Sequence, residues 1–146
     1  MWKYISEQYL ATRINAKVGN GKEYRKQYNV RGYPTVLLLN PDGTEIDRLF
    51  GWSGDKEQYF QTLIDYTNNK NTIGDLTNRQ AQSPDDVEIN YLLAKRRADR
   101  DELQLAKPYF ENIIKLDPED RYGYKIESKG FLAVNHLFTE GDDKPL

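Results

Sequence analysis

The chain has 146 residues, of which 38% are hydrophobic and 30% charged, and its formal net charge is -2. This length fits one ordinary domain or two small ones, and the balanced charge argues against a dedicated nucleic-acid binder and against a polybasic membrane anchor. With no cysteine and one histidine, His136, the sequence excludes disulfides, thiolate chemistry, a histidine-based zinc site and a Ser-His-Asp triad, and no apolar run approaches the ~20 residues of a membrane span.

The first 52 residues mix strand and turn signals. Met1–Glu7 is typical of the end of a helix. Gln8–Ala16 shows partial alternation of apolar and polar residues together with β-branched side chains, which predicts a strand. After the break at Gly19-Asn20-Gly21, Lys22–Tyr28 is predicted as a short helix, because it has tyrosines four residues apart on one face.

A β-hairpin is predicted next. Thr35–Leu39 is a continuous apolar run, which is typical of a strand buried on both faces. Asn40-Pro41-Asp42-Gly43 is a strong turn signal, because proline presets φ at the second position and glycine accepts a positive φ. Thr44–Phe50 is the predicted return strand.

From about residue 53 the pattern is helical. The spacing of apolar residues and the positions of turn signals predict five helices, at about 55–66, 73–81, 87–98, 103–116 and 124–138. Pro108 falls inside the fourth of these, so it must lie in the first turn or kink that helix.

The helical half contains a spacing typical of a repeat. Pro84 and Pro118 are 34 residues apart, which is the period of the tetratricopeptide helix pair. The small and apolar positions of that pattern fall on Leu93, Ala94, Ala106 and Phe110. One helix pair therefore resembles a tetratricopeptide unit. A capping helix follows at residues 121–138, in which Ser128 and Phe131 fit the small and aromatic positions of the pattern. Asn90 and Arg97 depart from the aromatic positions of the pattern, and a plain helical hairpin remains an equal alternative.

The first half carries a more specific resemblance. The run from Tyr28 to Leu39, Y-N-V-R-G-Y-P-T-V-L-L-L, is followed by Pro41-Asp42-Gly43, Ile46-Asp47-Arg48 and Gly51. These motifs resemble, in order and spacing, the C-terminal half of a thioredoxin-fold domain. The resemblance implies a cis peptide bond before Pro34. It also implies an α/β fold class, with a partial thioredoxin-like domain of three strands and flanking helices at 1–68 and a helical tetratricopeptide-like extension at 69–146.

The family's first strand, first helix and second strand, with its Cys-x-x-Cys motif, have no counterpart in this sequence. The chain therefore resembles the back part of a longer protein. Because the missing second strand is normally central, two buried strands are expected to have unpaired edges. Either Tyr9–Ala16 closes directly against Thr35–Leu39, or another chain supplies the strand, which makes self-association a prediction.

Without a dithiol we expect no catalytic residue, no cofactor and no metal. The resemblance implies that an extended peptide pairs with the backbone beside the proline turn, and the candidate peptide-binding residues are Gly32, Tyr33, Pro34, Thr35 and Trp52. A structural alternative is that Pro34 only sets a tight turn and Trp52 packs on a helix. The expected function is redox-inactive protein or peptide binding, at this edge or on the concave side of the helices, with no nucleic-acid or membrane partner.

Two alternatives remain. The chain is a truncated piece of a thiol–disulfide oxidoreductase whose cysteines lie upstream of residue 1, or the resemblance is accidental and the protein is a small helical protein with one hairpin. The sequence does not indicate the compartment.

Overall fold

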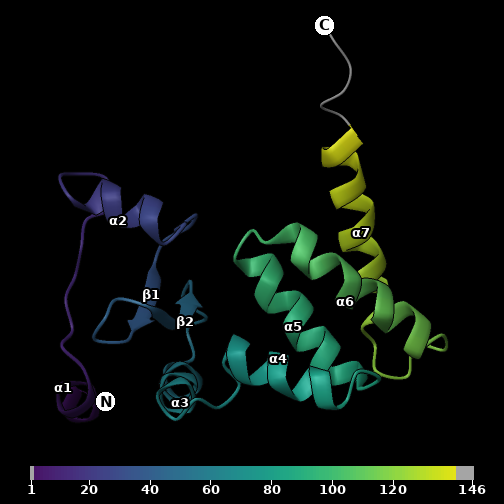
Figure 1. The fold of residues 1–146 in the computed structure, drawn as a ribbon, viewed down its shortest axis with the longest axis horizontal. Coiled ribbons are helices and arrows are strands. Elements are labelled where there is room, and N and C mark those ends of the chain that lie inside the picture. Colours follow the sequence, from purple (N-terminus) through teal and green to yellow (C-terminus); the bar gives the residue numbers. More distant parts are fainter. Residues whose placement is uncertain (1, 141–146) are drawn as a thin grey trace, which may run out of the picture. The chain divides into compact units, whose positions relative to one another are not determined.

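The computed structural model describes the backbone of residues 2–140 and the side chains of residues 3–134. The chain forms two compact units, Met1–Asn68 and Asn69–Leu146. Within the described residues there are seven helices and one two-stranded antiparallel sheet (Figure 1). The expected fold class, with three strands and flanking helices, is therefore wrong: the described chain is mainly helical.

The first unit contains the predicted hairpin. Its elements are α1 (Trp2–Gln8), α2 (Gly21–Gln27), β1 (Thr35–Leu39), β2 (Glu45–Phe50) and α3 (Lys56–Thr67). The two strands pair antiparallel, with Val36 opposite Leu49, and an irregularity follows Leu38. The turn closes with the N–H of Asn40 donating to the carbonyl of Thr44 at 2.8 Å, and Gly43 has a φ of +83°, as the turn signal predicts.

The predicted strand at Gln8–Ala16 is wrong. After α1 ends at Gln8, residues 9–15 have neither helical nor strand structure and lead to α2 (Figure 1). A strand needs a neighbouring strand to pair its N–H and C=O groups, and the described sheet contains only β1 and β2. The side chain of Leu10 is fully exposed and that of Ile14 is 48% exposed. Within the residues that the structure describes, Tyr9–Ala16 does not close against β1 and no third strand is present.

A small apolar core holds α1 and α3 on one face of the hairpin. Its buried members are Leu38, Leu49, Leu63 and Tyr66, with partly buried Ile5, Tyr9, Ile46, Tyr59 and Phe60 packed against them. The Tyr9 hydroxyl also donates to Oγ1 of Thr67 at 2.7 Å. Helix α3 begins at an N-cap, Asp55, whose carboxylate accepts from the N–H of Gln58.

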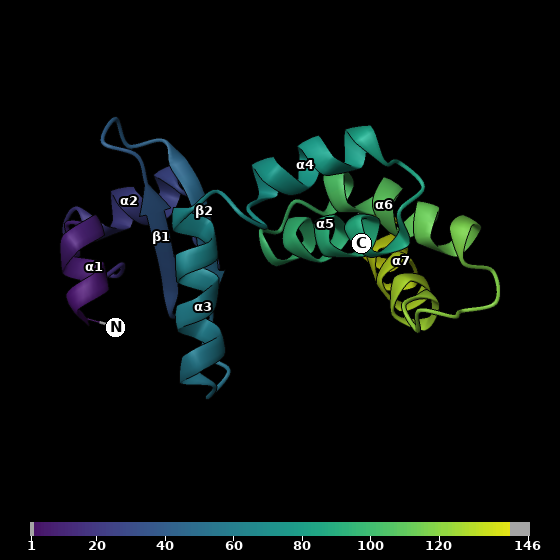
Figure 2. The same cartoon turned by 90° about the horizontal axis from the view of Figure 1, so that it is seen from below.

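The second unit is helical, as predicted. It contains α4 (Ile73–Gln82), α5 (Val87–Asp99), α6 (Leu103–Leu116) and α7 (Lys125–Glu140), and Figure 2 shows these helices from below. Thr72 and Asp86 cap α4 and α5 by accepting from backbone N–H groups. Pro108 lies inside α6, beyond its first turn.

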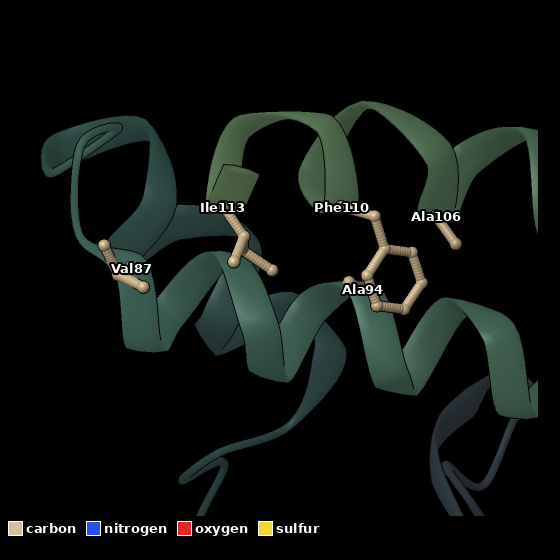
Figure 3. Close-up of a cluster of buried hydrophobic side chains, with 5 residues drawn as sticks. All are labelled: Val87, Ala94, Ala106, Phe110 and Ile113. Atoms are coloured by element: carbon tan, nitrogen blue, oxygen red, sulfur yellow. The ribbon is translucent and has the colours of Figure 1, made fainter. Parts of the chain in front are cut away.

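The main core of the second unit lies between α5 and α6. Its buried members, drawn in Figure 3, are Val87, Ala94, Ala106, Phe110 and Ile113. The ring of Phe110 lies 4.2 Å from that of Phe131, which brings α7 onto the same core. A second cluster of Leu76, Ile89 and Leu93 joins α4 to α5.

Candidate functional site

Strand β1 has one edge without a neighbouring strand in the described part of the chain. The N–H of Gly51 donates to the carbonyl of Pro34 at 2.8 Å, and Val36 faces Leu49 two residues further along. Hydrogen-bonded and non-hydrogen-bonded pairs alternate along an antiparallel ladder. The backbone N–H and C=O groups of Thr35 and Leu37 therefore point away from β2, toward the free edge.

A groove of about 400 Å³ lies beside this free edge. The segment that links α1 to α2, called the extended segment below, contributes Thr12, Ile14 and Ala16 to its lining. Helix α2 and its flanks contribute Gly21, Tyr24, Arg25, Tyr28 and Val30, and β1 with the preceding turn contributes Tyr33, Thr35, Val36, Leu37 and Leu39. Much of its apolar lining is open to solvent: Ile14 is 48% exposed and Tyr33 is 53% exposed. The groove thus combines an unpaired strand edge with accessible apolar side chains.

Two contacts hold the walls of the groove in place. The buried Arg48 of β2 donates through Nη2 to the carbonyl of Tyr28 at 2.8 Å, and the Tyr28 hydroxyl donates to the carbonyl of Gly43 at 2.9 Å. These bonds fix the end of α2 to the hairpin. On the opposite wall, a Cβ added to Gly21 would lie 2.0 Å from the carbonyl oxygen of Asn15, so only glycine permits this close approach of the extended segment to α2.

The structure brings together part of the predicted peptide-binding set. Tyr33 and Thr35 line the groove, and the peptide bond between Tyr33 and Pro34 is cis. A Cβ built on Gly32 would meet no atom within 4 Å, so the backbone there is open to an approaching chain. Trp52 is not among the groove residues: its ring, 56% exposed, packs edge-on against Tyr59 of α3, with centroids 5.2 Å apart.

Sequence reasoning missed the wall opposite β1. Thr12, Ile14 and Ala16 lie at every second position of the segment that was predicted as a strand, and this alternation was the signal available for them. Tyr24, four residues before Tyr28, supports the predicted helix at Lys22–Tyr28, but nothing in that spacing indicates that it lines a groove.

A second, basic hollow of about 630 Å³ lies on the same unit. It is lined by Ala16, Lys17, Lys22, Arg25, Lys26, Asn29, Val30 and Arg31. Ala16, Arg25 and Val30 also line the groove, so the two depressions adjoin.

The helical unit has a polar cluster that joins α5 to α7. The Tyr91 hydroxyl and the Lys95 ammonium donate to the two oxygens of the Glu127 carboxylate, at 2.6 Å and 2.7 Å. Bonding to this carboxylate raises the pKa of Lys95, and the same contacts lower the pKa of Glu127. The rings of Tyr91 and Tyr124 also stack, with centroids 3.8 Å apart. Each of these groups is satisfied by another, which makes the cluster a structural link.

No group of metal-binding side chains occurs among the described residues, and no helix there has the length and apolar character to cross a membrane. The side chain of His136 lies outside the described residues. Comparisons with protein-family models, with curated proteins and with solved structures find no match for this chain.

Proposed function

We propose that the first unit is a non-catalytic, thioredoxin-like interaction module that binds an extended peptide by strand addition along β1. The observation that carries this proposal is the free edge of β1, where the backbone groups of Thr35 and Leu37 face the groove. Peptide recognition by strand addition uses such an edge for affinity and neighbouring side-chain pockets for specificity.

The dimensions of the groove suit a short strand. β1 has five residues, so its edge is about 17 Å long at ~3.4 Å per residue. Thr35 and Leu37 together offer two N–H donors and two C=O acceptors, and each net hydrogen bond contributes about 0.5–1.5 kcal/mol. Burial of the exposed apolar lining adds to this, since covering apolar surface is favourable by about 25 cal/mol per Å².

The first test uses a defined strand peptide. We expect an acetylated, amidated hexapeptide of alternating Thr and Val to slow amide hydrogen exchange at Thr35 and Leu37. Exchange at Val36 and Leu38 should change little, because their N–H groups already bond to β2. N-methylation at the alternate peptide residues whose N–H groups face β1 should abolish binding. N-methylation at the intervening residues should leave binding unchanged. Binding that ignores this register, or the absence of any shift along β1, would refute strand addition.

Two matched substitutions check the place of binding. Tyr33 lines the groove and is 53% exposed, whereas Tyr122 in the helical unit is 58% exposed and is not among the groove residues. We expect Tyr33→Ser to weaken peptide binding and Tyr122→Ser to leave it unchanged. Equal effects of the two substitutions would place the peptide elsewhere.

Self-association is the competing use of the same edge. β1 of a second copy would satisfy the same backbone groups. In that case the sedimentation mass should rise with protein concentration, and the hexapeptide should return it to that of a monomer. A mass independent of concentration would count against self-association and leave the edge to a peptide.

A further inference from the structure

We infer that the peptide that occupies the groove is acidic at one end, because the groove adjoins the basic hollow. This inference rests on the proposed function and adds the chemical class of the partner. Between residues 13 and 31 the sequence holds six basic residues and one acidic residue, in a chain whose net charge is -2. Positive charge is therefore concentrated on the segment that contributes Ile14, Tyr24 and other residues to the lining of the groove.

The hollow gathers most of this charge at one place. Five of its lining residues are basic: Lys17, Lys22, Arg25, Lys26 and Arg31. The side chains of Lys17, Lys22 and Lys26 are exposed, and within the described part of the chain their ammonium groups form no ion pair. Clustered charges of one sign raise the local concentration of oppositely charged groups and favour a partner of complementary charge.

The position of the hollow restricts the acidic residues to one end of the peptide, and the orientation of the peptide decides which end that is. Asn29, Val30 and Arg31 line it and immediately precede the turn into β1, so it lies near the N-terminal end of that strand. A peptide added antiparallel to β1 would place its C-terminal end there, and a parallel peptide its N-terminal end. An acidic tail should therefore help at one end only.

A nucleic acid is the other polyanion that such a basic surface could attract. The groove favours a polypeptide, because the free edge of β1 requires alternating N–H and C=O partners, which a nucleic acid does not provide. The walls beside that edge are also mainly aliphatic and tyrosine side chains. The acidic peptide is the occupant that fits both depressions together.

The test measures affinity with a panel of tailed peptides by fluorescence anisotropy. The alternating Thr/Val hexapeptide carries three Glu, three Gln or three Lys at either its N- or its C-terminus. At low ionic strength we expect the Glu tail at one end to bind about five- to tenfold more tightly than the Gln tail, with the Lys tail weakest. This preference should shrink at 0.5 M salt, where exposed charges are screened within about 5 Å.

Two triple variants assign the effect to the hollow. Lys17→Gln, Lys22→Gln and Lys26→Gln together should remove most of the preference for Glu, because they eliminate three of the five cations of the hollow, and should leave binding of the Gln-tailed peptide unchanged. The matched control variant replaces three exposed lysines elsewhere, Lys3, Lys56 and Lys107, by Gln, and it should keep the full preference although its net charge changes equally.

The outcomes separate this inference from the proposed function. Equal binding of Glu- and Gln-tailed peptides would overturn the acidic partner and leave strand addition standing. Failure of every peptide to bind would overturn both. Tighter binding of a single-stranded oligonucleotide than of the Glu-tailed peptide, lost in the first triple variant, would show that the hollow serves a nucleic acid and would also overturn the inference.

Discussion

Arg48 should be a position at which substitution strongly destabilises the first unit. It is 6% exposed, and its Nε donates to Oε1 of Glu45 at 2.7 Å while Nη2 contacts Oε2 of the same carboxylate and donates to the carbonyl of Tyr28. Arg48→Met keeps much of the side-chain bulk but removes all three bonds. It leaves the Glu45 carboxylate, 16% exposed, without its guanidinium partner.

The expected decrease in the free energy of unfolding follows from this geometry. Removing one partner of a buried ion pair costs about 3–5 kcal/mol, and we expect about 3 kcal/mol because Glu45 retains some access to water. A unit of 68 residues has a free energy of unfolding of about 3–10 kcal/mol. With an m-value of about 1 kcal/mol/M in urea, the midpoint of unfolding should fall by about 3 M.

The assay can follow each unit separately. Both tryptophans of the chain lie in residues 1–68, so tryptophan fluorescence reports on the first unit, while circular dichroism at 222 nm is dominated by the helices of the second. The substitution should shift the fluorescence transition and leave the main circular-dichroism transition in place. Arg48→Lys keeps the charge but not the bidentate contact, so its loss of folding stability should lie between zero and that of Arg48→Met.

A double-mutant cycle isolates the pair itself. If Arg48 acts through Glu45, then Arg48→Met combined with Glu45→Gln should lose less than the sum of the two single variants, with a coupling of about 1–3 kcal/mol. A loss below about 1 kcal/mol for Arg48→Met, or additive losses in the cycle, would refute the reasoning. The same variant should also weaken peptide binding, because Arg48 holds Tyr28 in the wall of the groove.

Three further predictions concern the helical unit. Asn90, fully buried, donates to the carbonyls of Pro84 and Asp86, so Asn90→Ala should lower the free energy of unfolding by about 1–3 kcal/mol in urea titrations followed at 222 nm. Burial, and then bonding to a carboxylate, raise the pKa of Tyr91 to about 12. An unfolded tyrosine ionises near 10, so stability should fall between about pH 10 and 12, and less so in Tyr91→Phe. The Asp117 carboxylate accepts a hydrogen bond from the N–H of Tyr122, which lowers the pKa of this carboxyl group. Its contribution to folding stability should be complete above the unfolded pKa of 3.8 and should be lost as the pH falls through the lower folded pKa. Asp117→Asn should therefore flatten the acid limb of a stability–pH profile.

Much of the local structure was predictable because its signals are local. The hairpin was found from an apolar run and a Pro-Asp-Gly turn, and β1 has the predicted bounds, Thr35–Leu39. The helix at Leu103–Leu116 also begins and ends as predicted, because its apolar spacing and the Asp-Pro pair that follows define it. In each case a turn or a cap next to a periodic run fixes the element without reference to distant residues.

The site was less predictable, because it depends on contacts between distant segments. Tyr33 and Thr35 were named from the turn, but the opposite wall comes from residues about twenty positions earlier. Trp52 was placed in the binding set because it follows β2 closely in the sequence, but its ring packs against Tyr59 of α3, which is the structural alternative stated for this residue. Asn90, which departs from the aromatic position of the repeat pattern, is buried because carbonyls of the preceding loop and helix cap satisfy its amide.

The wrong strand and the missed wall have the same physical origin. In an extended chain, side chains at every second residue lie on the same side, whether or not the backbone pairs with a neighbour. Thr12, Ile14 and Ala16 alternate along the chain as in a strand and all three line the groove, while the backbone of residues 9–15 lacks strand pairing. Alternation of apolar and polar residues indicates which side chains share a face, whereas a strand is defined by the hydrogen bonds of its backbone. The free edge of β1 and the groove beside it occupy the place where a pairing strand was expected, and this unfilled edge is the feature on which the proposed strand addition depends.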